Sequence, residues 1–311
     1  MKFSLLVSLA TLSGAAAFSV APSTTQHAAS LALFSTASPH NEEQGRVSRR
    51  QVLSDTTAAG AALAWMTTMA SPLAAHAQGS SVQNVVVAGA TGQTGSRIYE
   101  RLLKQGFTTT GGVRNLQKAK LPSPDNLKHL DVVEDSLDSL TALLKGTDGL
   151  IIACGMNPGK NLLRMSAAAH EVDNLGTKKL IQAAKDAGVS KVVLVSSILT
   201  NGRGWGQQDS PGFVATNAFG GALDEKLEAE KFLRSSGLDY TIVRPGGLKA
   251  KAPTGALSIN AEDTLNSGEI SRDLVAEVCI ASLKDPKASN KVLEIIEDEG
   301  VPPKVFNGLV M

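Results

Sequence analysis

The sequence predicts an α/β fold, a doubly wound parallel sheet that forms a single domain over residues 82–311. Two observations predict it. From residue 84 onward, short continuous runs of aliphatic and β-branched residues alternate with longer segments of helical periodicity. The apolar runs lack the alternation of a half-exposed strand, which is typical of parallel strands buried on both faces. Alternating strands and helices imply right-handed crossovers, so helices are expected on both faces of the sheet.

The strands are expected where the apolar runs occur. The first run, NVVVA, ends at a glycine-rich turn, and the sixth, DYTIVRPGGL, is ended by Pro245, which has no N–H for a ladder hydrogen bond. Two stretches between the runs, 199–221 and 248–270, are rich in Gly, Pro and Asn and are expected to be ligand-binding loops. The expected strands occupy residues 84–88, 107–114, 126–133, 148–155, 191–198, 239–245 and 291–297.

The helices are expected in the segments between these strands. In the first helix, Ile98 and Leu102 fall on one face, and Gly106 ends it. The fourth helix carries many internal acid–base pairs, and Ser271 is well placed to cap the last. The expected helices occupy residues 96–106, 136–146, 170–188, 222–237 and 271–285.

Residues 1–77 are interpreted as targeting segments and not as part of the fold. Residues 1–17 have a basic start, a short apolar core and small residues, the pattern of a secretory signal peptide. Residues 18–47 are rich in Ser, Thr and Ala and almost free of acids, the composition of a plastid transit peptide. Residues 48–77 contain twin arginines, an apolar run and an A-x-A site, which together predict a twin-arginine export signal.

These three segments in series predict where the protein works. The motif AAAFSVAP resembles the cleavage site of plastid precursors in algae whose plastids lie inside extra membranes, and RRQVL with its apolar run resembles a thylakoid signal. We therefore expect a plastid protein in the thylakoid lumen or associated with the thylakoid, including peripheral association with the membrane. The alternative is the stroma, if residues 46–77 only extend the transit peptide. The apolar run is shorter than a comfortable membrane span.

The composition excludes several classes of function. The formal net charge is +1, so no strongly basic face is implied and nucleic acid is not an expected partner. The two cysteines, Cys154 and Cys279, each lie in an apolar run and are interpreted as small buried hydrophobic residues. No clustered His or Cys spacing predicts a metal site.

A glycine-rich turn follows the first strand and opens the first helix. Gly89 permits the tight turn, Gly92 lets backbone N–H groups approach a pyrophosphate, and Gly95 lets the helix pack closely. The N-terminus of the helix adds unpaired N–H donors and its dipole. The turn therefore predicts a Rossmann-type dinucleotide site. It comprises Gly89, Ala90, Thr91, Gly92, Gln93, Thr94 and Gly95.

The ends of other strands complete this expected cofactor site. Arg114 ends the second strand, near where an NAD-binding domain usually has an acid, and a guanidinium there suits the 2′-phosphate of NADP. NADP is therefore expected in preference to NAD. Asp131 ends the third strand and is expected beside the adenine. Pro245 breaks the sixth strand, and Gly246 and Gly247 after it allow the chain to pass close to the nicotinamide.

The motifs as a set resemble a known family. The chain carries VAGATGQTG, GVRN, VDNLGTKKLIQAAKDAGVSKVVLVSSILTNG, EKLEAEKFLRSSGLDYTIVRPGGL and EDTLNSGEISRDLVAEV. Together they resemble the atypical, NmrA-like short-chain dehydrogenase/reductases over residues 84–298, and in particular chloroplast NAD(P)-binding Rossmann proteins of unassigned reaction. That group includes flavin and biliverdin reductases, redox sensors and plastid assembly factors, so the fold alone does not settle the activity.

The resemblance implies a catalytic set from which one member is missing. Catalytic relatives use a serine after the fifth strand and a Tyr-x-x-x-Lys motif on the next helix. Ser197 matches the serine and Lys226 the lysine, but Ala222 stands where the tyrosine is expected. Neither Tyr99 nor Tyr240 is followed by a lysine at the required spacing. Ser197 is either catalytic or a strand-end hydroxyl that bonds the backbone, and Lys226 either serves the cofactor or pairs within its helix.

Three further residues have two interpretations each. Asn174 matches a position that in relatives helps to hold the active-site helix, or else it is a surface amide. Arg244 binds a ligand or pairs with an acid. Trp205, expected to be exposed in a glycine-rich loop, is a lid over a planar substrate or an ordinary loop anchor.

Two functions therefore remain open from the sequence. The first is a plastid NADPH-dependent reductase that transfers hydride to a small hydrophobic or conjugated acceptor without the usual tyrosine acid. The second is a non-catalytic, NADP(H)-responsive binding or assembly protein whose partner belongs to a photosynthetic complex.

Overall fold

The computed structural model describes residues 82–157, 164–218 and 220–309. The predicted targeting segments, residues 1–17, 18–47 and 48–77, lie outside the described residues and stay predictions. Within the described ranges, no helix combines the length and the apolar composition needed to cross a membrane.

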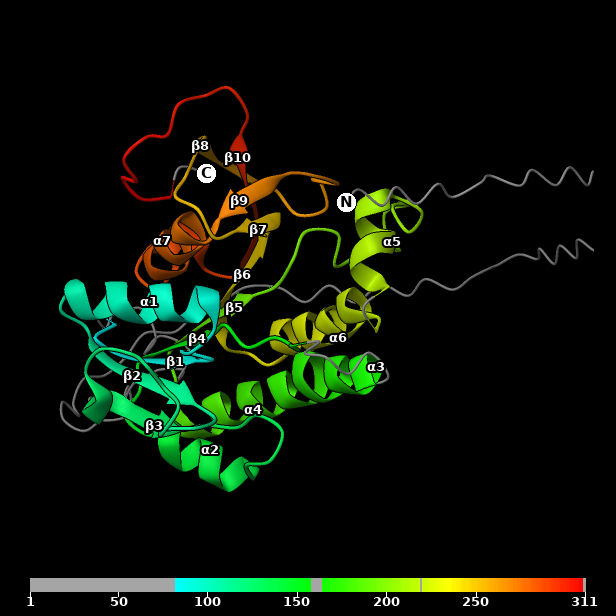
Figure 1. Ribbon diagram of the computed structural model, residues 1–311. Helices are drawn as coiled ribbons and strands as arrows, with labels where there is room; N and C mark the ends of the chain where they lie inside the picture. The colour runs from blue at the N-terminus through cyan, green and yellow to red at the C-terminus, as the bar shows by residue number, and fades with distance from the viewer. Residues whose placement is uncertain (1–81, 158–163, 219, 310–311) are drawn as a thin grey trace, which may run out of the picture. The chain divides into compact units, whose positions relative to one another are not determined.

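A single large sheet forms the centre of the described part of the chain (Figure 1). Seven of its strands run parallel, and β8, at one edge, is antiparallel to its neighbour β10. In spatial order the strands are β3 (Leu127–His129), β2 (Thr108–Val113), β1 (Asn84–Ala88), β4 (Gly149–Ile152), β5 (Lys191–Val195), β6 (Asp239–Pro245), β10 (Lys291–Asp298) and β8 (Ala256–Asn260). The order reverses between β1 and β4, the switch point at which such sheets bind ligands.

Helices cover both faces of this sheet, as the sequence predicts (Figure 1). On one face α1 (Gln93–Lys104) packs beside α7 (Arg272–Ser282). On the other face lie α2 (Leu137–Leu144), α4 (Thr177–Ala187) and α6 (Ala222–Ser235). The predicted cap of α7 is confirmed, since Ser271 Oγ accepts the N–H of Asp273 at 3.2 Å. The fold is therefore the predicted doubly wound α/β sheet.

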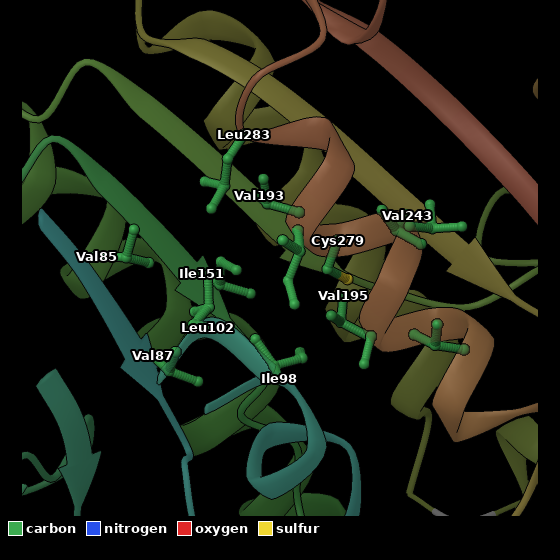
Figure 2. Close-up of a cluster of buried hydrophobic side chains, with 14 of the residues drawn as sticks. Val85, Val87, Ile98, Leu102, Ile151, Val193, Val195, Val243, Cys279 and Leu283 are labelled. Carbon is green, nitrogen blue, oxygen red and sulfur yellow. The ribbon is translucent and has the colours of Figure 1, made fainter. Parts of the chain in front are cut away.

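The strand residues divide between two hydrophobic clusters because successive side chains point to opposite faces. Val85 and Val87 of β1 face α1 and α7, together with Ile98, Leu102 and Cys279 (Figure 2). The intervening Val86 and Ala88 belong to the cluster beneath α2 and α4. Because both faces are buried, the strands need no polar residues, which explains the continuous apolar runs in the sequence.

Part of the expected loop structure is wrong. The stretch 199–221 contains α5 (Pro211–Asn217), which starts with a serine cap and a proline in its first turn. The stretch 248–270 contains β8, and β9 (Glu269–Ser271) pairs with β7 (Gly247–Lys249) in a small separate sheet. These strands are short, and long-range contacts hold them. The Glu297 carboxylate accepts backbone N–H groups from Thr254, Gly255 and Ser271.

A buried cluster of charges joins β6 to α6, β10 and the loop before β9. Arg244 on β6 has a fully buried side chain, and it donates to Glu230 Oε2 at 2.7 Å and to Asp263 Oδ1 at 2.7 Å. Glu294 and Glu262 approach the same guanidinium at 3.3 Å. Burial opposes the charge, but these carboxylates outweigh it and raise the pKa of Arg244. Of the two interpretations of Arg244, the structure supports pairing with acids.

We predict that Arg244→Met destabilises the protein strongly. The substitution leaves the carboxylates of Glu230 and Glu294 buried without their cation, which costs about 3–5 kcal/mol in the free energy of unfolding. Urea unfolding followed by circular dichroism measures the change. Arg203→Met is the matched control, since Arg203 pairs with Asp224 at an exposed site and such pairs contribute about 1 kcal/mol or less. Equal losses from the two substitutions would contradict the role given to the buried cluster.

Candidate functional site

The glycine turn lies at the carboxyl end of β1, at the switch point of the sheet. Gly89 has φ +80°, and an ideal Cβ on it would lie 2.9 Å from the carbonyl oxygen of Ala153. An ideal Cβ on Gly95 would lie 2.1 Å from the carbonyl oxygen of Gly89, closer than any real contact. Both positions therefore require glycine, one for backbone conformation and both for close packing. The structure gives Gly89 and Gly95 the local roles that the sequence predicts.

The first turn of α1 presents backbone donors with no side chain capping them. Gly92 is the N-cap, in extended conformation, and no side chain accepts a hydrogen bond there. Thr91, Gly92 and Gln93 are exposed, whereas Ala90 is buried. The first helical hydrogen bond runs from Ser96 N–H to the Gly92 carbonyl at 2.8 Å. The earlier N–H groups of the helix lack intrahelical partners, and the dipole adds positive potential, so the turn suits an anion.

Arg114 and Asp131 lie at the neighbouring strand ends. Arg114 follows β2 directly and is exposed, and its guanidinium makes no ion pair within the part of the chain that the structure describes. Asp131 lies two residues beyond β3, which is shorter than predicted, and its Oδ1 accepts the N–H of Val133 at 2.9 Å. Asp131 therefore orders its own turn, and its second carboxylate oxygen accepts no hydrogen bond from the residues that the structure describes.

The charged side chains at these strand ends all influence Cys154, the residue after Ala153 at the end of β4. Burial raises the pKa of the Cys154 thiol to about 12. Asp173 and Asp131 raise this pKa further, and Lys226 and Arg114 lower it. Charged side chains from four separate segments thus act electrostatically on the Cys154 sulfur. This is expected where the carboxyl ends of parallel strands meet. The high pKa makes this thiol an unreactive, neutral group at pH 7.

Lys226 forms an ion pair that the sequence did not predict. Its Nζ donates to Asp173 Oδ1 at 2.8 Å, and the Asp173 side chain is only 1% exposed. The alternative partner, Glu230, is instead bound to Arg244. Together with Cys154, Asp173 and Lys226 line a small cavity under the carboxyl ends of β4 and β5. Nothing in the local charge pattern around Asp173 indicated this contact, because its partner is distant in the sequence.

Asp173 belongs to a π-helical turn, His170–Gly176, that lies between α3 (Met165–Ala169) and α4. The sequence predicted one regular helix over residues 170–188. This prediction is wrong for residues 170–176, which form the wider π-helical turn. Thr177 Oγ1 donates to the carbonyl of Val172 at 2.9 Å, which satisfies a carbonyl in the widened turn. A Cβ on Gly176 would lie 2.8 Å from the carbonyl of Glu171, so glycine is needed there. Such turns occur frequently at functional sites.

Asn174 is buried, and its amide donates to Glu225 Oε2 on α6 at 2.6 Å. Of its two interpretations, holding the helix that carries Lys226 is the one that the structure supports. Trp205, expected to be exposed, is half-buried and packs against a small cluster that includes Leu199 and Phe213. The loop around it is therefore anchored by an apolar contact.

Ser197 and Pro245 lie on adjacent strand ends. Ser197 is half-buried, and its carbonyl accepts the hydroxyl of Thr200 at 2.6 Å. The N–H of Ile198 donates to the Pro245 carbonyl at 3.0 Å, which ties the chain after β5 to the end of β6. Ala222, in the first turn of α6, is buried. No tyrosine lies on α6, and within the described residues no group of His, Cys, Asp and Glu is arranged to hold a metal ion.

Known proteins share both the sequence and the fold. A family model described as NAD(P)H-binding matches residues 89–286. The chain is 43% identical over 231 residues to the uncharacterized chloroplastic protein At2g34460 of Arabidopsis thaliana, covering 73% of this chain and 81% of that protein. It is 35% identical over 240 residues to chloroplastic TIC 62 of the same plant, covering 70% of this chain but 36% of TIC 62.

Solved structures agree with this assignment. The anaerobillin reductase ChuY of Escherichia coli O157:H7 is 27% identical, with a TM-score of 0.56, and the match covers 71% of this chain and all of ChuY. The predicted family and fold are confirmed by these matches. The chain belongs to the NAD(P)H-binding family, among the atypical short-chain dehydrogenase/reductases.

Proposed function

We propose that the protein is a plastid NADPH-dependent reductase that delivers hydride to a small hydrophobic or conjugated acceptor. The glycine turn carries the proposal, since it leaves backbone donors free at the switch point, where the strand order reverses between β1 and β4. Two relatives support reduction by their names. The sanguinarine reductase of Eschscholzia californica is 29% identical over 263 residues, and ChuY is named an anaerobillin reductase.

The residues present fit a dinucleotide. An ideal Cβ on Gly92 would lie 3.1 Å from the carbonyl oxygen of Gly89 and 4.0 Å from that of Ala153. Both neighbours lie on the inner side of the turn, so glycine there leaves space on the outer side. The amides of residues 93–95 would hold the diphosphate, and Arg114 would pair with the 2′-phosphate. Asp131 lies toward the adenine and Pro245 toward the nicotinamide. NADPH supplies a hydride, and a proton from water or from Lys226 completes the two-electron reduction of the acceptor.

Lys226 and Ser197 are the candidate catalytic residues. Without a tyrosine, Lys226 is the cationic group at the end of β4, where it hydrogen-bonds the cofactor ribose or supplies a proton. Ser197 orients a polar atom of the acceptor from the end of β5. Conjugated acceptors spread negative charge over many atoms, so their reduction depends less on a positioned acid.

A second function is favoured by one observation, the buried alanine at position 222. A protein that binds NADP(H) without turning it over needs no acid there, and its loops would report the redox state to a photosynthetic-complex protein. Relatives named chloroplastic support a plastid location for either function. The thylakoid lumen or peripheral thylakoid association remains our proposal from residues 48–77, with the stroma as the alternative.

We predict that the full-length protein oxidises NADPH in the presence of a flavin, quinone or open-chain tetrapyrrole. Gly92→Ala should lower kcat/KM for NADPH at least about tenfold, because the added methyl group occupies the surface that a diphosphate must approach. Absorbance at 340 nm follows the reaction. Gln105→Ala, after the other end of α1, is the matched control and should leave the rate unchanged.

The outcomes separate the two functions. Tight NADPH binding with no oxidation by any acceptor would favour the non-catalytic protein. Oxidation that is equally fast in the Gly92→Ala variant would contradict the assignment of the turn.

We predict that Arg114→Glu reverses the preference for NADPH over NADH. The carboxylate repels the 2′-phosphate, and it suits the free ribose hydroxyls of NADH. The ratio of dissociation constants for the two cofactors, measured by fluorescence titration, should change by about tenfold or more. Lys104→Glu makes the same change of charge at an exposed position at the end of α1, and it should leave the ratio unaltered. A variant at Arg114 that still prefers NADPH would remove the NADP assignment.

A further inference from the structure

We infer that Asp173 is a positioning residue that holds the Lys226 ammonium at the carboxyl end of β4, ready for the cofactor ribose. This inference rests on the proposed function, because it assigns Lys226 to the cofactor. It adds a residue from the π-helical turn to a site that otherwise consists of strand ends and α6.

Both carboxylate oxygens of Asp173 are occupied, by two different parts of the fold. Oδ1 accepts from Lys226 Nζ at 2.8 Å, and Oδ2 accepts the backbone N–H of Met156 at 3.2 Å. The Asp173 side chain is 1% exposed and Lys226 is 21% exposed. A carboxylate that is buried so completely needs a cation and hydrogen-bond donors to replace the water it has lost. Asp173 has one of each, so its position is fixed.

The pair lies directly beside the chain that follows β4. An ideal Cβ on Gly155 would lie 3.6 Å from Asp173 Oδ1 and 3.9 Å from Lys226 Nζ. The preceding strand end also contacts the glycine turn, since the carbonyl of Ala153 lies against Gly89. Asp173 therefore places the ammonium at the end of β4, whose other neighbour is the turn proposed to hold the diphosphate.

The widened turn brings a second contact alongside the first. Asp173 binds Lys226, and the next residue, Asn174, binds Glu225, the residue before Lys226 on α6. Two consecutive side chains on one helix thus hold two consecutive side chains on the other. This double contact fixes the start of α6 relative to the π-helical turn, so that the direction of the Lys226 side chain is determined.

The consequence is preorganisation of the ammonium. A free lysine side chain has many rotamers, and binding a ribose with it costs the entropy of ordering a flexible four-carbon stem. Asp173 orders the Lys226 side chain before the cofactor binds, which lowers the entropic cost of binding. In relatives with the usual motif a tyrosine stands one turn before the lysine, whereas here Ala222 contributes no polar atom.

The experiment measures NADPH binding by calorimetry in the full-length protein and four variants. Asp173→Asn should weaken binding about tenfold, the effect of losing one charge-assisted hydrogen bond. Lys226→Met should weaken it by a similar factor. The double variant should bind no more weakly than Lys226→Met alone, because Asp173 acts only through Lys226. The matched control is Asp239→Asn, which breaks the Lys191–Asp239 pair of 2.7 Å at the amino ends of β5 and β6, away from the site, and should not change binding.

The possible outcomes distinguish a failure of the proposed function from a failure of the role inferred for Asp173. Wild-type protein that gives no heat with NADPH overturns the proposed function, and this inference with it. Wild-type binding with an unchanged Asp173→Asn variant overturns the inference alone, as does a double variant whose losses simply add.

A second measurement keeps the inference testable if Asp173→Asn fails to fold. The Lys226 ammonium resonance, assigned by its absence in Lys226→Met, is observed by NMR in the wild-type protein. A hydrogen-bonded, slowly exchanging ammonium that shifts on saturation with NADP⁺ is the expected result. A freely exchanging signal that NADP⁺ leaves in place would overturn the positioning role.

Discussion

The contact between α1 and the turn before it determines the geometry of the whole site. Gly95 lies so close to the Gly89 carbonyl that even a methyl group would meet it at 2.1 Å. This approach directs the N-terminus of α1 at the carboxyl ends of the strands, at the point where the strand order reverses between β1 and β4. Three parts of the proposed site lie around the N-terminus of α1: the exposed amides of its first turn, Arg114 after β2, and the strand end beside Lys226. A larger residue at position 95 would displace the helix and with it the donors.

Buried carboxylates are paired with cations at two places in the structure, and the two pairings have different consequences. Around Arg244 several carboxylates surround one fully buried guanidinium. Two of them, Glu230 and Glu294, are fully buried as well, and the cluster ties strands and loops together. At Asp173 one buried carboxylate meets one partly exposed ammonium. Because Lys226 keeps an accessible side, the second pair can also meet a ligand. The same electrostatic requirement therefore stabilises the fold at Arg244 and prepares a functional group at Lys226.

The sequence predicted those features that depend on local pattern. Continuous apolar runs indicated the central strands, the glycine spacing indicated the turn, and Ser271 was identified as a cap. Features that depend on distant partners were missed. The short strands β8 and β9 form because β10, far along the chain, pairs with β8 and its Glu297 accepts backbone N–H groups before β8 and in β9. The strand β7 in turn pairs with β9. The Asp173–Lys226 pair spans 53 positions, and the π-helical turn that enables it has no periodicity of its own. Trp205 was misjudged because glycines flank it, while its apolar partners come from other segments.

The most direct test of the account is an NMR titration of the full-length protein with NADP⁺, following the backbone amides of the glycine turn. The account predicts large, saturable shifts of the N–H resonances of Gln93 and Thr94, because these groups change from solvent to a diphosphate. It predicts small shifts for amides at the other end of α1. Saturable binding that leaves the turn amides unmoved, or no binding at all, would contradict the central claim.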